Sequence, residues 1–218
     1  MSEQDSQATL SGWRHGPVWT YVVALLASAV ALFVSFALSA QTLQLARHPL
    51  SKLSCDINAT ISCTTVAQSW QSEILHFGDL SIPNAFLGIA AESVFVTIAV
   101  IGLARVRLPA WFARLTWLGS LLALLYAYWL LSQSLFVIKA LCPWCLGLMF
   151  STTIQFMAIS HASVSVQGLP KADGPFAGLR SPLNRYYRLH FDLMLDAIWI
   201  VALVVLIVVS EGPALFAS

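Results

Sequence analysis

The chain has 218 residues, of which 58% are hydrophobic and only 10% are charged, and its formal net charge at pH 7 is +1. Soluble domains carry about 25% charged residues, so this composition predicts an integral membrane protein. The chain has no basic cluster and no Gly-rich phosphate-binding motif, which argues against nucleic-acid and nucleotide binding.

The first predicted span is the uncharged run of residues 17–40, which follows an N-terminal segment of residues 1–16. Its length exceeds the roughly 20 residues that a membrane-crossing helix needs. A cleaved signal peptide is the alternative, but the apolar run is too long and Leu38-Ser39-Ala40 is a poor cleavage site. We therefore expect a retained helix.

Three more runs with few or no charges predict further spans at residues 82–104, 115–138 and 141–160. Glu92 is the one charged residue within them. A fifth span, residues 190–212, is less clear, because it reaches crossing length only if Asp192 and Asp196 lie near one membrane surface. These spans leave loops at residues 41–81 and 163–189 and a short tail at 213–218.

Lysines and arginines determine the predicted orientation, because cytoplasmic loops carry an excess of them. With a cytoplasmic N-terminus, three of the 11 basic residues lie outside, namely Arg47, Lys52 and Lys139. The other eight lie inside: Arg14, Arg105, Arg107, Arg114, Lys171, Arg180, Arg185 and Arg188. We therefore expect a multi-pass protein of the cell membrane whose C-terminus is extracytoplasmic.

The four cysteines, Cys55, Cys63, Cys142 and Cys145, then all lie on the extracytoplasmic side, where disulfides persist. Pro143 favours the first turn of a helix, so Cys142 is predicted at the N-cap of the fourth span, where the helix N-terminus lowers the pKa of a thiol. Cys145 lies about 4.5 Å further along the helix. We expect Cys142 to face water and Cys145 to face the membrane interior.

The other two cysteines flank the start of a short predicted helix in the outer loop. Ser62 is a suitable N-cap for a helix that begins at Cys63, and Val66 and Trp70 would share one face of it with Cys63. Cys55 precedes this helix on an irregular segment. The sequence thus indicates an outward dithiol and a second dithiol at the membrane edge, and it leaves three disulfide connectivities open.

Two other interpretations of the four thiols are a zinc site and a pair of structural disulfides. No His stands beside the cysteines to complete a zinc site, and a Cys-x-x-Cys ring is typical of thiol exchange rather than of stapling. A thiol relay needs an electron acceptor. Because the chain has no intramembrane His pair for haem and no flavin or nicotinamide motif, elimination leaves a quinone dissolved in the lipid.

A set of residues in order and spacing resembles the vitamin K epoxide reductase family, over residues 22–157. The set is Cys55-Asp56-x-Asn58, Ser62-Cys63, Ser69, Pro83-Asn84, Gly88 and the Cys142/Cys145 pair. The five-span layout resembles the bacterial members, in particular the actinobacterial ones. The resemblance implies an all-α membrane fold: a four-helix bundle around a quinone pocket at residues 17–162, capped by the outer loop, with a fifth helix beside it.

The resemblance also implies a quinone-dependent protein-dithiol oxidoreductase that uses menaquinone or ubiquinone, without metal or flavin. A separate extracytoplasmic thioredoxin-fold (DsbA-like) partner would hand electrons to the Cys55/Cys63 pair. Cys63 would then attack Cys142 of a Cys142–Cys145 disulfide, which releases Cys145 to face the quinone.

Four further residues take their expected roles from the resemblance. Asn84 matches a residue that hydrogen-bonds a quinone carbonyl, Ser69 matches a small polar residue that supports the cap, and Asp56 matches a loop acid. Met149 stands where animal members carry a tyrosine. Since methionine cannot donate a hydrogen bond, plain quinone reduction is expected here rather than epoxide reduction.

Glu92 is not explained by any motif. An acidic residue at mid-span costs about 2.5–3.5 kcal/mol on insertion scales and is usually paired or functional. Asn84, Gly88 and Glu92 are spaced by four and so share one helix face. Glu92 is expected either to be protonated and hydrogen-bonded to a neighbouring helix, for example to a Ser, Tyr or Gln of the third span, or to relay one of the two protons that quinone reduction consumes.

Two rival functions are a conduit that carries electrons outward to reduce periplasmic thiols and a non-catalytic scaffold with structural disulfides. A conduit needs cysteines that are reachable from the cytoplasm. A scaffold predicts that the cysteines can be lost without loss of redox activity.

Overall fold

The computed structural model describes residues 10, 12–58, 60–73, 75–77, 80–106, 108–171 and 176–215. Five helices of this part are long and apolar enough to cross a membrane. They are α1 (Pro17–Arg47), α3 (Asn84–Leu103), α4 (Ala110–Ser132), α5 (Pro143–Ser165) and α7 (Phe191–Leu215). The predicted all-α membrane architecture with five spans is confirmed.

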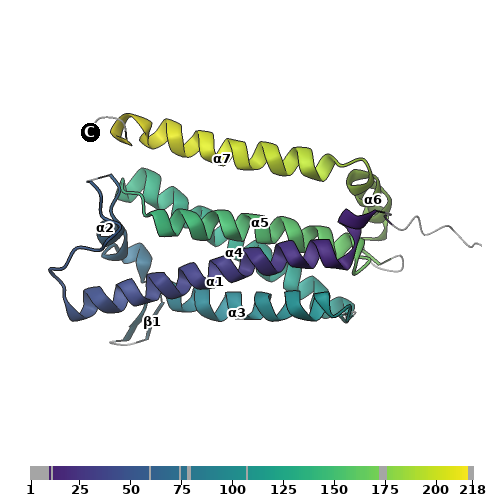
Figure 1. Ribbon diagram of the computed structural model, residues 1–218, viewed down its shortest axis with the longest axis horizontal. Coiled ribbons are helices and arrows are strands. Elements are labelled where there is room, and N and C mark those ends of the chain that lie inside the picture. Colours follow the sequence, from purple (N-terminus) through teal and green to yellow (C-terminus); the bar gives the residue numbers. More distant parts are fainter. Residues whose placement is uncertain are drawn as a thin grey trace, which may run out of the picture.

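Four of the helices form a bundle with α1 at its centre. Helix α1 packs along both α3 and α5, and α4 packs on α5 (Figure 1). Small side chains allow these close approaches: Ala24 and Ala31 of α1 are almost fully buried, and a side chain at Gly102 of α3 would collide with the ring of Tyr21. Gly88 meets Ser35 in the same way, with 2.5 Å between an added Cβ and Ser35 Oγ.

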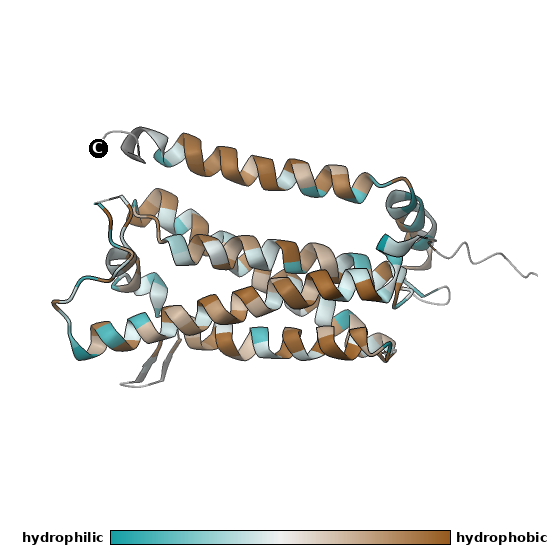
Figure 2. Cartoon of the chain, in the orientation of Figure 1, coloured by the Kyte–Doolittle hydropathy of each residue, from teal (hydrophilic) through white to brown (hydrophobic). Residues whose placement is uncertain are grey.

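Helix α7 lies beside the bundle rather than within it (Figure 1). Leu203 and Ile207 are buried against a cluster that contains Leu131 of α4 and Met149 of α5. Most of the other side chains of α7 are exposed and apolar, as the brown ribbon of Figure 2 shows. This outward surface suits contact with lipid.

Short elements gather at the two ends of the bundle (Figure 1). The end called here the α6 end carries η1 (Trp13–His15), η4 (Ala177–Leu179) and α6 (Arg180–Arg188). The opposite α2 end carries α2 (Cys63–Ala67), η2 (Trp70–Ser72) and an antiparallel hairpin of β1 (Leu75–Phe77) and β2 (Leu80–Ile82). Cys63 therefore marks the end at which the thiols lie.

Several boundaries differ from the sequence prediction. Helix α1 continues to Arg47 instead of ending at residue 40, because the residues that follow, such as Gln41 and Leu45, are compatible with a helix outside the apolar core. Helix α6 and the hairpin were not predicted. Arg107, which entered the predicted orientation, lies outside the described residues, as do residues 1–9 and 216–218 of the predicted terminal segments.

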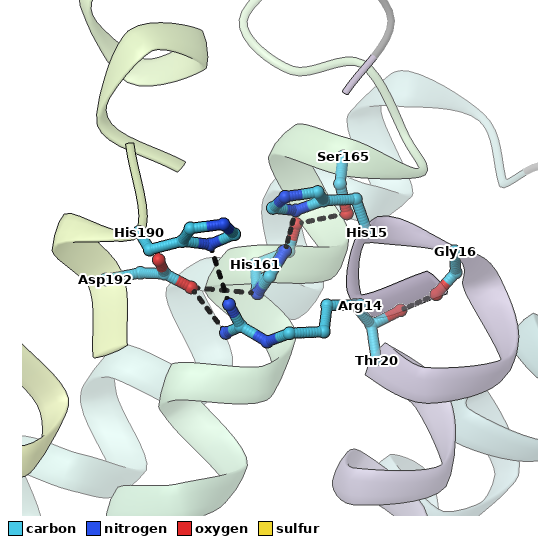
Figure 3. A network of polar contacts seen from close by, with 8 residues as sticks. All are labelled: Arg14, His15, Gly16, Thr20, His161, Ser165, His190 and Asp192. Carbon is cyan, nitrogen blue, oxygen red and sulfur yellow. Dashed lines mark hydrogen bonds and ion pairs between the residues drawn. The ribbon is translucent and has the colours of Figure 1, made fainter. Parts of the chain in front are cut away.

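A polar cluster joins three segments at the α6 end (Figure 3). The Arg14 guanidinium is 2.8 Å from His190 Nδ1 and donates to Asp192 Oδ2 at 3.3 Å. His161 Nδ1 lies 3.4 Å from the same Asp192 oxygen, and His161 Nε2 lies 2.8 Å from His15 Nδ1. Burial lowers the pKa of His15, so its ring is neutral at pH 7 and can share a hydrogen bond with His161. The cluster fixes the start of α7 against η1 and α5.

We expect Asp192→Asn to destabilise this junction. Asp192 is only 4% exposed, and removing one partner of a buried ion pair costs about 3–5 kcal/mol; Arg14 retains some contact with solvent, so the lower end applies. Thermal unfolding of the purified protein in detergent measures the effect. Asp196→Asn, one turn along α7 and outside the ion pairs of the described residues, is the matched control. Equal stability of both variants would show that the cluster does not hold α7.

Candidate redox site

Backbone pairing brings the outer loop against the start of α5. The Leu141 N–H donates to the Thr60 carbonyl at 2.7 Å, and the Ser62 N–H donates to the Leu141 carbonyl at 3.0 Å. These bonds form a parallel bridge between Ile61 and Leu141. Because one cysteine follows each paired segment, Cys63 and Cys142 are placed next to each other.

The residues that follow α4 position Leu141 for its pairing with the outer loop. The chain leaves α4 through a π-helical turn, η3 (Gln133–Ile138), and then passes through Lys139 with a left-handed backbone, φ 55°. The Ser134 hydroxyl donates to the Ala140 carbonyl and the Ala140 N–H donates back to the Ser134 carbonyl. The turn directs Leu141 toward the loop.

The four thiols form one compact group. Cys55 and Cys63 are joined in a disulfide, whereas Cys142 and Cys145 are free thiols. Cys142 Sγ lies 3.4 Å from Cys63 Sγ. A sulfur of one pair is thus in contact with a sulfur of the other pair, as thiol–disulfide exchange requires. In this disulfide-bonded state the sulfurs of Cys55 and Cys63 are not available as thiolate ligands.

Cys142 occupies the predicted N-cap of α5, and its Sγ accepts the Cys145 N–H at 3.3 Å. The Cys145 thiol, followed by the backbone N–H groups of Cys145 and Trp144, stabilises the thiolate and lowers the pKa of Cys142 despite its burial. Ser62 likewise caps α2, accepting the Thr65 N–H. Both predicted caps are confirmed.

The expectation that Cys142 faces water is wrong. Cys142 is 2% exposed and Cys63 is 1% exposed, because both pack with Leu45 and Leu53 beneath the outer loop. Cys55 is the partly exposed member of the bonded pair. Cys55 and Cys145 are therefore the partly exposed members of the two pairs, and Cys63 and Cys142 are the buried members that contact each other.

A cavity of about 360 Å³ opens within the bundle on the other side of these thiols. Its wall is mostly apolar side chains of α1, α3, α4 and α5, and its polar members include Cys145, Ser69, Asn84 and Glu92. Small-molecule pockets have volumes of roughly 300–1,000 Å³ and apolar walls with a few polar groups. The cavity therefore fits a flat apolar ring, and Cys63, Cys142 and Cys145 all contribute to its lining.

Polar side chains organise the outer rim of this cavity. Asn84 Nδ2 donates to the Gln71 carbonyl at 2.5 Å, and Gln71 Nε2 donates to Gln133 Oε1 at 3.4 Å. The Ser69 hydroxyl donates to the Val66 carbonyl at 2.6 Å, at the end of α2. These bonds attach α2 and η2, which cover this end of the cavity, to α3 and to the end of α4. Asn84 and Ser69 therefore lie at the outer rim of the cavity.

Asp56 lies in the loop between Cys55 and Cys63, and its carboxylate binds four groups of that loop. It accepts the Leu53 N–H, the Thr64 N–H, the Thr64 hydroxyl and the Ser62 hydroxyl, at 2.5 to 3.1 Å. Burial opposes ionisation, but these hydrogen bonds outweigh it and lower the pKa of Asp56. Asp56 therefore holds together the loop segments that carry Cys55 and Cys63.

Comparison with known families accounts for this arrangement. The family model described as the vitamin K epoxide reductase family matches residues 22–160. The chain belongs to this family. No curated protein sequence matches the chain.

Membership makes the chain a multi-pass membrane oxidoreductase of thiols and disulfides, with redox chemistry linked to quinones. The matched residues hold the whole candidate site: the four cysteines, Asp56, Ser69, Asn84 and Glu92. Helices α6 and α7 and the polar cluster of Figure 3 lie outside the match. All of these candidate residues lie in the four-helix bundle or in the loop that covers its α2 end.

Glu92 lies on the predicted face of α3, since Asn84, Gly88 and Glu92 all line the cavity. Its expected partner on a neighbouring helix is Gln155 of α5, in the fourth span, rather than a Ser, Tyr or Gln of the third span as suggested. Sequence reasoning missed Gln155. The available signal was the presence of an amide in the middle of an apolar run, at a position that is 0% exposed in the structure.

Proposed function

We propose that this chain oxidises the dithiol of a separate extracytoplasmic thioredoxin-fold (DsbA-like) protein and passes the electrons to a membrane quinone, menaquinone or ubiquinone. The observation that carries the proposal is the 3.4 Å contact between Cys63 and Cys142 beside a cavity lined by Cys145. The contact between Cys63 and Cys142 therefore connects the loop disulfide to the thiol pair of α5. That thiol pair lines a pocket whose apolar walls suit a flat ring.

The first exchange takes place at the loop. A partner thiolate attacks Cys55, the more accessible sulfur of the loop disulfide, and Cys63 leaves as a thiolate. The second partner thiol then releases Cys55, so the partner becomes oxidised and the Cys55/Cys63 pair becomes reduced.

The second exchange takes place beneath the loop. The Cys63 thiolate attacks Cys142 of a Cys142–Cys145 disulfide and releases Cys145. Cys55 then attacks Cys63, and Cys142 leaves, which its lowered pKa favours. The products are a Cys55–Cys63 disulfide and two thiols on α5, the arrangement that the structure holds.

A quinone in the cavity supplies the acceptor for two electrons and two protons as the Cys142–Cys145 bond re-forms. The residues placed to bind it are Asn84 at the rim, through a hydrogen bond, and the apolar wall, through contact with the ring. Met149, 3% exposed, contributes only apolar contact and a sulfur, which supports quinone rather than epoxide reduction.

The rival functions find less support. A conduit needs thiols near both membrane surfaces, and all four cysteines lie at the α2 end. A scaffold gives no reason for Cys142 and Cys145 to be reduced and in contact with a second pair. The basic residues of η1 and α6 lie at the opposite end, which supports an extracytoplasmic position for the thiols.

Complementation tests the function. In bacteria that lack their own disulfide-generating membrane enzyme, the wild-type chain is expected to restore disulfides in an exported reporter protein, and the four single Cys→Ala variants are not. Each variant must reach the membrane in wild-type amount, as judged by immunoblotting. Restoration by all four variants would indicate a scaffold, and no restoration by the wild type would remove the proposed function.

A further inference from the structure

The inner end of the cavity differs from its apolar walls. Glu92 lines it and is 3% exposed, and Gln155 beside it is 0% exposed. Within the described part of the chain, no hydrogen bond of standard geometry satisfies Glu92 Oε2 or either polar atom of the Gln155 amide, although the two side chains are close enough to interact. Buried polar groups are nearly always satisfied, so this pair needs an explanation in terms of function.

The pair lies in a seam of polar atoms between α1, α3 and α5. Ser28 and Ser35 are 0% exposed, and their hydroxyl oxygens also have no hydrogen bond among the described residues. Seven residues apart, they lie on one face of α1, and Ser35 meets α3 at Gly88. Glu92 is one turn beyond Gly88, about 6 Å further along α3. The seam therefore leads from the cavity toward the middle of the bundle.

The direction of the Glu92 side chain points it toward the cavity. Side chains of a helix lean toward its N-terminus, and α3 begins with Asn84 at the rim. The Glu92 carboxyl therefore lies over the turn that contains Gly88, inside the cavity lining. No cation forms an ion pair with it among the described residues, and a buried carboxyl without such a partner is stable in its neutral form. It thus carries a proton at the place where an acceptor binds.

We propose that Glu92 is the proton donor to the quinone and that Gln155 is the residue that positions it. This inference rests on the proposed function. The Cys142/Cys145 dithiol loses two electrons and two protons as its S–S bond forms, and the quinone gains two electrons and two protons. Glu92 gives the quinone one proton and the Cys145 thiol gives the other. The second thiol proton leaves to water and the Glu92 carboxylate takes one proton back from water between turnovers, so charge and atoms balance over the cycle.

Other titratable groups face the same space and must be separated from Glu92 in a pH profile. The groups that line the cavity are the thiols of Cys142 and Cys145, the phenol of Tyr126 and Cys63, which titrates only when its disulfide is reduced. None of them is changed by Glu92→Gln, which keeps the size of the side chain and removes its proton. A difference between the wild-type and variant profiles therefore reports Glu92.

The experiment compares Glu92→Gln, Glu92→Asp and Gln155→Leu with Glu211→Gln. Glu211 is a carboxyl of α7 that is 7% exposed and outside the cavity lining, so it is a matched control. Turnover of a soluble quinone analogue with a dithiol is measured from pH 6 to pH 8. Removing a general acid lowers rates by roughly 100-fold or more. We expect such a loss for Glu92→Gln, growing as pH rises, a partial return in Glu92→Asp and a smaller loss in Gln155→Leu.

Infrared difference spectroscopy gives a second measurement that does not depend on turnover. Reduction of the bound quinone is expected to change the C=O stretch of a protonated carboxylic acid in the wild type and in Glu211→Gln. The change should be absent in Glu92→Gln and shifted in frequency in Gln155→Leu.

The outcomes separate the two proposals. Wild-type turnover and an unchanged infrared signal in a stable Glu92→Gln variant would overturn the proton role while the proposed function stands. If Glu92→Gln does not fold, Glu92→Asp takes its place: a wild-type carboxyl frequency there would overturn the role. No quinone reduction by the wild-type protein would overturn the function itself.

Discussion

Cys145→Ala is expected to abolish quinone reduction, down to the background reaction of dithiol with quinone. Cys142 and Cys145 both line the cavity, but Cys142 also contacts Cys63 of the loop disulfide, which leaves Cys145 as the thiol assigned to the acceptor. Without Cys145 the α5 pair cannot form its disulfide, so two electrons cannot leave for the acceptor. The measurement is the rate at which the purified variant reduces a soluble quinone analogue with a dithiol as electron donor.

The Cys145→Ala variant must unfold at the wild-type temperature for this result to count. Glu211→Gln, which changes a buried side chain away from the cavity, controls for general effects of substitution and should keep the wild-type rate. A Cys145→Ala protein that still reduces the analogue at the wild-type rate would show that the order of the relay is wrong.

The features that were predictable from sequence are those determined by neighbours along the chain. Apolar runs gave the five spans, because the bilayer requires long uncharged helices. Pro143 indicated the first turn of α5 and placed Cys142 at its N-cap, and Ser62 did the same for α2. These caps depend on residues within one helical turn, so sequence alone specifies them.

The features that were missed depend on how distant segments pack. Cys142 is buried because Leu141 pairs with Thr60 and Ser62. No local sequence pattern predicts this pairing. The neighbour of Glu92 was suggested to come from the third span, but the packing of the bundle places Gln155 of α5 beside it. The spacing of residues along α3 predicts which of them share a helix face. It does not predict which helix packs against that face, because this depends on how the helices of the bundle pack.

The double variant Cys55→Ala/Cys145→Ala is expected to hold a Cys63–Cys142 disulfide. Exchange between the two pairs passes through that mixed disulfide, and in the wild type Cys55 and Cys145 are the thiols that resolve it. The two remaining sulfurs already lie 3.4 Å apart in a buried site, so oxidation should join them without movement of the loop. Mass spectrometry of a non-reduced digest identifies the cross-linked peptides.

A matched variant tests whether this cross-link reports the relay or only the proximity of thiols. Cys63→Ala/Cys145→Ala keeps Cys55, which lies on the partly exposed side of the loop, together with Cys142. If only Cys63 exchanges with Cys142, this variant should give little cross-link under the same mild oxidation. Equal yields from both variants, or no Cys63–Cys142 bond in the first, would contradict this exchange step. A high yield confined to the first variant would identify the two sulfurs through which the pairs communicate.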